Sequence, residues 1–460
     1  SGEVVRRILD EGERYGAVDI GRGRRVQVEF VSANPTGPLH IGHGRGAAIG
    51  DVIARLLEFT GHRVTREYYI NDAERSRQMR LFAESLEARY MQALGREAEL
   101  PPEGYHGEYM LDIARRIAEQ HGDRFLHMPR EERLRALMKL GRDMMVEEHR
   151  RDLERFRVRF DVWFSEQSLY ESGEVWETMD LLRRSGHAYE ADGALWLRST
   201  DFGDDKDRVL VRQDGSPTYL ASDLAYHRNK FARGFDLVID IWGPDHHGYI
   251  ARTKAGLQAL GLDADRVEIF VHQIVRLTAG GEPVRMSKRE GELVTLRQLM
   301  DEVGVDAARF FFLMRSADAH LDFDLELAKK ESAENPVYYV QYAHARLCSL
   351  FKEAEERAVK MPDPEGVDFS LLSTEEEKSL AMALSEFPSE VEAAARRREP
   401  HRLVAYAREL AKRFHLFYDR CPVLAERPKL RDARLLLCKA THIVLRNTLE
   451  LLGVSAPERM

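Results

Sequence analysis

Residues 26–46 constrain the fold most, because a strand pattern changes there into a helix pattern across a glycine-rich turn. β-Branched and aromatic residues dominate 26–31, which is typical of a buried strand. Asn-Pro and Gly-Pro dipeptides follow and favour turns. Apolar residues then recur at helical spacing within 49–61. The stretch is therefore predicted to be a strand, a loop and a helix start, with His40 and His43 at the junction.

Further β-rich runs extend this unit into a sheet. A run at 63–70 completes a strand–helix–strand unit, which predicts parallel strands and a right-handed crossover. The continuous apolar run 237–243 is typical of a strand covered on both faces, and 267–275 is predicted to be another strand. The charged, helical stretch 73–160 indicates an insertion between two halves of the sheet, and 194–212 indicates a small hairpin-rich subdomain.

The second part of the chain is predicted to be helical. A helix is expected over about 247–261, and Thr295 with Gln298 matches a capping box for another. From Asp306 onward every element is expected to be a helix. The amphipathic segments within 331–460 predict a helical bundle.

Composition excludes several classes of protein. The chain has 460 residues and a net charge of −9, which argues against a generally basic nucleic-acid coat protein. No apolar run reaches the length of a membrane span, and the first ten residues lack the apolar core of a signal peptide. The three cysteines, Cys348, Cys421 and Cys438, form no CxxC pair. A disulfide framework or cysteine-rich zinc site is therefore not expected, and a reducing cytoplasm fits.

His40 and His43 are the first candidates for chemistry. A helix start favours phosphate through its free amide groups, and imidazole donors add hydrogen bonds to a phosphate whose charge grows during reaction. The glycines at 42, 44 and 46 would let a ligand approach the backbone. Three alternatives stay open at this point. The histidines could be solvent-facing loop residues or metal ligands, or the glycines could form a dinucleotide fingerprint with Glu67 as its ribose carboxylate.

A second polar loop, 279–291, joins a predicted strand to the capped helix. Lysine is scarce in this arginine-rich chain, so Lys288 is distinctive. A lysine on a mobile, glycine-flanked loop can neutralise a departing pyrophosphate. A solvated surface loop is the alternative, and for this motif alone it is the favoured one.

Together the two stretches resemble a known family. His40-Ile-Gly-His43 and Met286-Ser-Lys288 are similar to the HIGH and KMSKS motifs of class I aminoacyl-tRNA synthetases. Arg285 and Arg289 stand where the family has Lys and Ser. Longer stretches narrow the resemblance to bacterial-type arginyl-tRNA synthetases: 28–46, 66–72, 241–249, 335–346 and 452–460.

The resemblance implies the fold class and the domains. It predicts an α/β, Rossmann-type parallel-sheet catalytic domain with inserts, followed by an all-α anticodon-binding bundle. The expected parts are a lead-in at 1–25, the catalytic domain at 26–305 with its insertion at about 73–160, a stem-contacting segment at 306–332 and the bundle at 333–460. The family usually has a further N-terminal domain. Ser1 lies about where that domain would end, so a shortened chain is expected.

The resemblance also implies an arginine–tRNA ligase that uses ATP and Mg²⁺ and acts on tRNA(Arg). The catalytic residues would be His40, His43 and Lys288. ATP would be bound by Gly37, His40, Gly42, His43, Gly44, Met286, Ser287 and Lys288. Arginine would be bound by Glu29, Asn34, Tyr219, Asp223 and His246. Tyr338 and Tyr342 would stack on unpaired tRNA bases. No metal-ligating residue is predicted, and the protein is expected to be a cytoplasmic monomer.

Several of these residues could instead have a structural role or another function. Asp223 could be a helix N-cap beside Ser222. The run Asp245-His246-His247 could belong to a manganese phosphoesterase, but no Asp-x-Asp run accompanies it. Tyr338 and Tyr342 could pack in a helix core. Two other functions compete with the ligase, namely a small-molecule nucleotidyltransferase with HxGH chemistry and a non-enzymatic RNA-binding paralogue.

Overall fold

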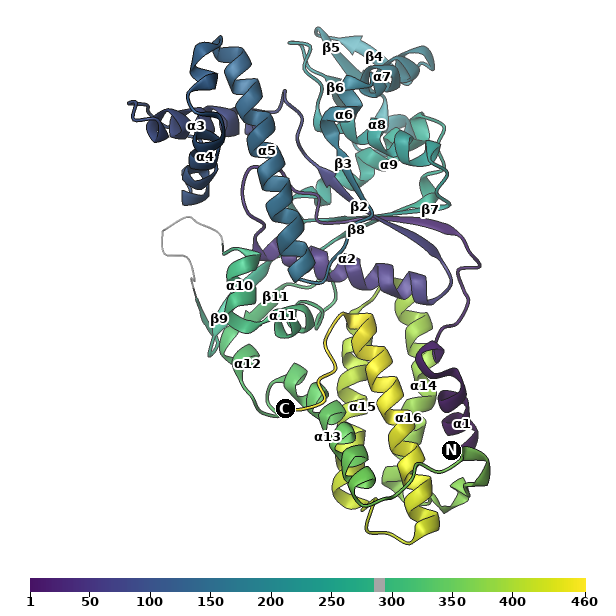
Figure 1. Ribbon diagram of the computed structural model, residues 1–460. Helices are drawn as coiled ribbons and strands as arrows, with labels where there is room; N and C mark the ends of the chain where they lie inside the picture. The colour runs from purple at the N-terminus through teal and green to yellow at the C-terminus, as the bar shows by residue number, and fades with distance from the viewer. Residues whose placement is uncertain (285–293) are drawn as a thin grey trace.

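The computed structural model describes residues 1–284 and 294–460. Its centre is a five-stranded sheet in the order β3-β2-β1-β7-β8 (Figure 1). All neighbouring strands in it are parallel, which confirms the predicted sheet. The strands are β1 (Arg25–Glu29), β2 (Arg63–Ile70), β3 (Val162–Ser165), β7 (Leu237–Trp242) and β8 (Val267–Val271).

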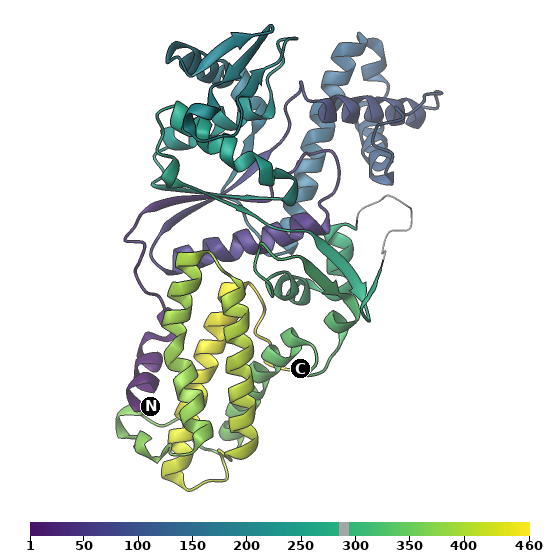
Figure 2. The same ribbon diagram turned by 180° about the vertical axis from the view of Figure 1, so that it is seen from behind.

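Helix α2 (Ile41–Phe59) lies between this sheet and the helices of the C-terminal part (Figures 1 and 2). His40 is its N-cap, as the strand–loop–helix pattern predicts. Burial of an aliphatic side chain contributes about 1.5–3 kcal/mol, so the apolar face of α2 stabilises this layer strongly. That face consists of the buried residues Ile49, Val52, Ile53, Leu56 and Leu57.

Two inserts interrupt the strands of the sheet and form separate lobes, one to each side in Figures 1 and 2. Between β2 and β3, three helices pack around a core of their own, which confirms the helical insertion. These are α3 (Arg77–Ala93), α4 (Glu108–His121) and α5 (Arg130–Arg155). Between β3 and β7 lies the predicted hairpin subdomain, whose strands are antiparallel. It contains α6 (Glu166–Glu171), α7 (Glu174–Arg184), β4 (Ala188–Ala191), β5 (Ala194–Leu197), β6 (Arg208–Val211) and α8 (Tyr219–Ala232).

Two predictions about the later elements are wrong. The run 267–275 is not one strand, because the chain leaves the first sheet after β8 and the Gln273 amide bonds to the Ala317 carbonyl. Its last residue opens β9 (Val275–Ala279) in a second sheet, with β10 (Glu282–Pro283) and β11 (Leu321–Asp324). The chain after 306 is therefore not entirely helical. In β11 the alternation of buried Leu321 and Phe323 with aspartates is a strand period that short flanking helices obscure.

The helix predicted at about 247–261 is shorter than expected. A 3₁₀ turn, Pro244–Tyr249, precedes α9 (Ile250–Ala259). The proline at the first position of this turn supplies a fixed backbone φ that suits a helix start. The segment that contains His246 therefore lies ahead of the regular helix.

The C-terminal part is the predicted helical bundle, joined to the catalytic part by short elements (Figure 2). Its long helices are α13 (Pro336–Glu356), α14 (Glu375–Arg397), α15 (His401–Arg420) and α16 (Pro428–Leu452). The remaining α-helices are α1 (Gly2–Glu11), α10 (Leu296–Val303), α11 (Val305–Phe312) and α12 (Leu325–Lys329). No helix within the described ranges is long and apolar enough to cross a membrane.

Buried Arg309 on α11 fixes the bundle to the catalytic part. Its guanidinium donates to Asp51 on α2 at 2.6 Å and to the Leu452 carbonyl at the end of α16 at 2.9 Å. A side chain at Gly453 would collide with this guanidinium, because a Cβ there would lie 2.3 Å from it. Charge-assisted hydrogen bonds in a dry interior hold such elements in one orientation.

Candidate active site

The candidate site lies where the parallel strands end, beyond Glu29 at the carboxyl end of β1. Val31 and Ser32, which follow Phe30, have positive φ angles of 70° and 50°. A β-branched residue rarely adopts this conformation, which costs of order 1–3 kcal/mol. The backbone of β1 is therefore turned sharply towards the edge of the sheet.

The insertion holds the strained loop from outside. His149 on α5 donates from Nε2 to the Gly37 carbonyl at 2.6 Å, and the Tyr109 hydroxyl on α4 donates to the Thr36 carbonyl at 2.6 Å. Burial lowers the pKa of His149 to about 4, so its ring is neutral. These bonds fix the loop that contains Gly37, one of the predicted ATP-binding residues.

His40 and His43 cap the start of α2 reciprocally. The Gly42 amide donates to His40 Nδ1 at 3.1 Å, and the His40 amide donates to His43 Nδ1 at 3.1 Å. The two rings stack with centroids 3.7 Å apart. Because each Nδ1 accepts, each neutral ring carries its proton on Nε2 and is a donor there. Burial lowers the pKa of both rings, that of His43 well below its usual value, so both are neutral at pH 7.

The expectation of free amide groups at this helix start is wrong. The Ile41 amide donates to the Val294 carbonyl at 3.1 Å, and the Gly44 amide donates to the His40 carbonyl at 3.1 Å. The Gly42 amide is taken by the His40 ring. The predicted phosphate binding at this place would therefore depend on the two Nε2–H groups.

Gly44 and Gly46 are required for packing inside the protein. A Cβ at Gly44 would lie 2.8 Å from Leu296 Cδ1, and one at Gly46 would lie 2.8 Å from His272 Nε2. Both glycines are buried. Packing inside the protein therefore explains both glycines, and an ATP contact by Gly44 stays a prediction.

The dinucleotide alternative is also wrong. Glu67 has no exposed surface, and Arg233 holds its two oxygens at 2.7 and 2.8 Å. A carboxylate engaged in such a bidentate pair is not available to bind a ribose.

Residues 286–288, the predicted second half of the ATP site, lie outside the described residues. The chain that follows them is bound to the histidine motif. Thr295 forms an isolated antiparallel bridge with His40, and the Leu296 amide donates to the Leu39 carbonyl at 2.8 Å. The predicted capping box of Thr295 and Gln298 is confirmed. Backbone hydrogen bonds therefore join residues 294–296, which follow the second motif in the sequence, to the histidine motif.

Glu29 belongs to a buried network of charges. Its Oε1 lies 2.9 Å from Lys230 Nζ, and its Oε2 accepts from the Ser32 hydroxyl at 2.7 Å. Lys230 is fully buried and also lies 2.7 Å from Asp240 Oδ1, while His227 Nε2 lies 2.5 Å from Asp240 Oδ2. Lys230 thus neutralises the carboxylates of Glu29 and Asp240, which lie on the neighbouring strands β1 and β7.

Asp223 lies within α8, one turn after Tyr219. Thr218 is the N-cap of this helix, so the N-cap interpretation of Asp223 is wrong. Burial raises the pKa of Asp223 to about 7, and the charges of Glu29 and Asp240 add to the rise. Tyr219 is 51% exposed, and its hydroxyl donates to Gln78 Oε1 at 3.1 Å.

Glu29, Glu166 and Asp223 form a cluster of carboxyl groups, which we call the acidic pocket. Two further residues of it, Glu166 and Tyr69, are not predicted by the sequence. Glu166 directly follows β3 and is only 5% exposed; burial and then the charge of Asp223 raise its pKa to about 8. Tyr69 on β2 has a buried hydroxyl without a hydrogen-bond partner among the described residues. Burial and then Glu166 and Asp223 raise its pKa well above 10. An unpaired buried hydroxyl beside carboxylates is expected where a polar ligand binds.

The remaining predicted arginine ligands are exposed. Asn34 lies on the strained loop and His246 lies in the 3₁₀ turn after β7. The neighbouring Asp245 acts electrostatically on His40, so this turn borders the histidine motif. The roles of Asn34 and His246 stay predictions.

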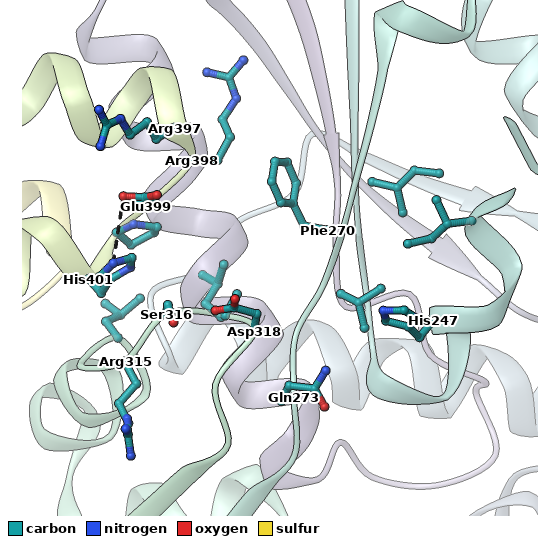
Figure 3. A pocket seen from close by; sticks show the side chains of 17 residues that line it. His247, Phe270, Gln273, Arg315, Ser316, Asp318, Arg397, Arg398, Glu399 and His401 are labelled. Carbon is teal, nitrogen blue, oxygen red and sulfur yellow. Dashed lines mark ion pairs between the residues drawn. The ribbon is translucent and has the colours of Figure 1, made fainter.

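A separate cavity of about 350 Å³ is shown in Figure 3. It lies between the 3₁₀ turn, the chain around Asp318 and the α14–α15 junction. Its polar lining includes His247, Arg398 and His401, but none of the predicted catalytic residues that the structure describes. We therefore do not assign the reaction to this cavity.

Tyr338 and Tyr342 lie one turn apart on α13. Their rings stack with centroids 6.1 Å apart, and Tyr342 is 39% exposed. The Arg346 guanidinium lies 5.3 Å from the ring centre of Tyr342. The alternative that Tyr342 packs in a helix core is therefore wrong, and its ring is accessible to a partner.

Comparisons with known proteins identify the class. Residues 4–316 match the family model "tRNA synthetases class I (R), catalytic domain", and residues 340–460 match "DALR anticodon binding domain". With the parallel sheet and the histidine pair at the start of α2, this makes the chain a member of the class I aminoacyl-tRNA synthetases.

Relatives then identify the family. The chain is 56% identical to the arginine–tRNA ligase of Carboxydothermus hydrogenoformans, over 99% of this chain and 82% of that one. Its fold matches the arginyl-tRNA synthetase of Thermus thermophilus at 25% identity with a TM-score of 0.78, over 99% of this chain and 86% of that one. A Campylobacter jejuni chain assigned to the same enzyme matches at 34% identity with a TM-score of 0.89, over 100% of this chain and 99% of that one. The chain belongs to the arginyl-tRNA synthetase family and is an arginine–tRNA ligase.

Proposed function

We propose that arginine binds in the acidic pocket at the ends of β1, β2 and β3. The observation that carries this proposal is the grouping of buried Glu29 and Glu166 and partly buried Asp223 around the Tyr69 hydroxyl, which has no hydrogen-bond partner among the described residues. A guanidinium offers five donors in a planar fork and suits paired carboxylate acceptors. Asp223, Glu166 and Tyr219 would bind this group.

The backbone end of arginine would lie nearer to β1. Glu29 keeps lone pairs free beyond its bonds to Lys230 and Ser32, and these can accept from the α-ammonium. Asn34 and His246 border the same edge and would complete this part of the site. This arrangement points the arginine carboxylate towards the start of α2.

ATP would lie along the start of α2, between the histidine motif and the second motif. His40 and His43 would donate from Nε2 to phosphate oxygens, and Lys288 would neutralise the departing pyrophosphate. Gly37, Gly42, Gly44, Met286 and Ser287 would line the nucleotide. Mg²⁺ fits as an ion carried by the ATP phosphates, whose charge it neutralises, because the histidine pair supplies neutral donors rather than carboxylates.

The reaction would need no covalent protein nucleophile. The arginine carboxylate attacks the α-phosphate in line, and pyrophosphate leaves. The adenylate then transfers arginine to the terminal ribose of tRNA(Arg). The protein contributes positioning and charge, and bound tRNA would be required for the first step.

The C-terminal part would supply the contacts to tRNA. Tyr338 and Tyr342 would stack on unpaired bases, 333–460 would bind the anticodon region, and 306–332 would contact the stem. The cytoplasmic location and the monomeric state belong to this proposal too.

Charging of an isolated tRNA pool tests the proposal. With ATP and Mg²⁺, the purified chain should attach arginine and leave lysine free. Attachment of lysine at a similar rate would contradict the selection by the acidic pocket. Nucleotidyl transfer to a small acceptor without tRNA, or tRNA binding without charging, would favour the two rival functions.

A further inference from the structure

Three metal-ligating side chains meet in the C-terminal bundle, apart from the candidate active site. His344 and Cys348 lie one turn apart on α13, and His442 faces them from α16. One ligand atom of each lies within 4.8 Å of the other two. The contact joins residues 94 positions apart, so no local spacing in the sequence indicates it.

The separation of Cys348 and His442 fits one tetrahedral ion. Cys348 Sγ lies 3.7 Å from His442 Nε2. With Zn–S of about 2.3 Å and Zn–N of about 2.0–2.1 Å, a tetrahedral site separates sulfur from nitrogen by roughly 3.6 Å. The helices α13 and α16 therefore hold these two side chains near coordination distance, and the His344 ring lies next to them.

His344 provides an independent observation. The residue is 3% exposed, and its Nδ1 donates to the Pro457 carbonyl at 2.9 Å. Its Nε2 is buried without a hydrogen-bond partner among the described residues. A ligating histidine commonly donates its other N–H to a backbone carbonyl, which fixes the tautomer and turns the free lone pair to the metal. The ring stacks on His442 with centroids 4.6 Å apart, so the two histidine rings lie side by side in the cluster.

The charges around the cluster act in both directions. Lys439 and Arg446 oppose a cation, whereas Glu458 favours one. On coordination the proton of the Cys348 thiol would pass to solvent.

Access to the cluster is open. His344 and His442 line a pocket of about 390 Å³ at the surface, and Glu458 lines the same pocket. An ion can therefore enter without unfolding of the bundle, and Glu458 is placed to supply an oxygen ligand.

We propose that His344, Cys348 and His442 bind one Zn²⁺ ion, with Glu458 in the fourth position. Thiolate and imidazole ligands select zinc over magnesium or calcium. The ion would connect α13, α16 and the C-terminal residues, and so stabilise the end of the chain that Arg309 joins to α2.

Cobalt titration of the full chain tests this site. We would add Co²⁺ to metal-free protein, follow thiolate-to-cobalt absorption in the near ultraviolet and the visible bands of tetrahedral cobalt, and then displace the ion with Zn²⁺. The expected result is one equivalent per chain. Absence of the thiolate band in the unmodified protein would overturn the proposal.

Variants assign the ligands. Cys348→Ser should abolish the thiolate band and weaken zinc binding at least tenfold, as should His442→Asn, which removes a partly exposed ligand. Cys438→Ala, which changes another cysteine, on α16, should leave both unchanged. Zn²⁺ should raise the Tm of the unmodified chain and of Cys438→Ala only. Equal zinc affinity in folded Cys348→Ser or His442→Asn and in the unmodified chain would contradict the site.

Discussion

The Ile41 amide donates a hydrogen bond of 3.1 Å to the Val294 carbonyl, and this bond ties the histidine motif to the chain that follows Lys288. Leu296 and Leu39 form a second such bond. The six residue-to-residue steps from Lys288 to Val294 span at most about 20 Å in a fully extended chain. This length is compatible with the proposed contact between Lys288 and a nucleotide at the start of α2.

Lys288→Ala should therefore impair adenylate formation. We expect kcat for arginine-dependent pyrophosphate exchange to fall by about 10²–10³, as when one transition-state donor is lost, with little change in arginine affinity. The matched control is Lys360→Ala, at an exposed position between α13 and α14. A similar kcat for Lys288→Ala and the control would contradict the role of this lysine.

Two substitutions at His40 separate capping from phosphate binding. Asparagine places an acceptor near the position of Nδ1 and caps helices well, but it lacks the outer donor. Glutamine reaches the position of Nε2 and restores that donor. We expect His40→Asn to keep the thermal stability but lose about 10²–10³ in kcat, and His40→Gln to retain more activity. Equal kcat in both variants would show that the Nε2–H group is not used.

The acidic pocket predicts how arginine binding depends on pH. Burial raises the pKa of Asp223 to about 7 and that of Glu166 to about 8, so both carboxyl groups are neutral in acid and ionised in base. Because the guanidinium cation favours the ionised form, the Kd for arginine should fall as pH rises from 6 to 9. The limit is about tenfold per pH unit for each proton released.

Calorimetry in buffers of different ionisation enthalpy checks this pH dependence through the protons released. Glu166→Gln should weaken arginine binding and flatten the profile, whereas Glu171→Gln, a change at the other end of α6, should do neither. A flat profile in the unmodified protein would contradict the role of Glu166 and Asp223.

Lys230→Met should destabilise the protein. The substitution leaves Glu29 and Asp240 buried without their shared cation, and breaking a buried ion pair typically costs about 3–5 kcal/mol. Lys329→Met is the control, because its pair with Glu302 is exposed and such pairs contribute little. Urea unfolding would measure both, and equal free energies of unfolding would contradict the structural role of Lys230.

Tyr342→Ala should weaken tRNA binding without affecting arginine binding. Stacking of a base on an aromatic ring contributes about 1–3 kcal/mol, which corresponds to roughly 5- to 150-fold in Kd. Met382→Ala removes another exposed apolar side chain, from α14, and serves as the control. Filter binding with tRNA(Arg) distinguishes the two, and an unchanged Kd in Tyr342→Ala would exclude this contact.

The sequence predicted those parts of the fold whose cause is local. The strand–loop–helix at β1 and α2 and the capping box of Thr295 follow from patterns within a few residues. β11 was missed because its pairing with β9 is a distant contact and its neighbours are helical.

In the candidate site, too, residues in a local motif could be predicted, whereas residues brought together by distant contacts could not. His40 and His43 lie three residues apart in one motif and could be predicted from the sequence. Glu166 joins the site only because β3 pairs with β2, which is separated from it in the sequence by the helical insertion. Lys230 reads as an ordinary charged residue of a helix. Its burial depends on β1 and β7 bringing Glu29 and Asp240 together, which no local pattern specifies.

The most direct test of the central claim is ATP–pyrophosphate exchange with tRNA(Arg) present, comparing arginine with citrulline, its neutral analogue of nearly the same shape. If the charges of Glu166 and Asp223 select the substrate, exchange should depend on arginine and be at least about 10²-fold slower with citrulline, because a site built for charge-assisted hydrogen bonds rejects a group that lacks them. Comparable exchange with both compounds, or none with arginine, would contradict the account.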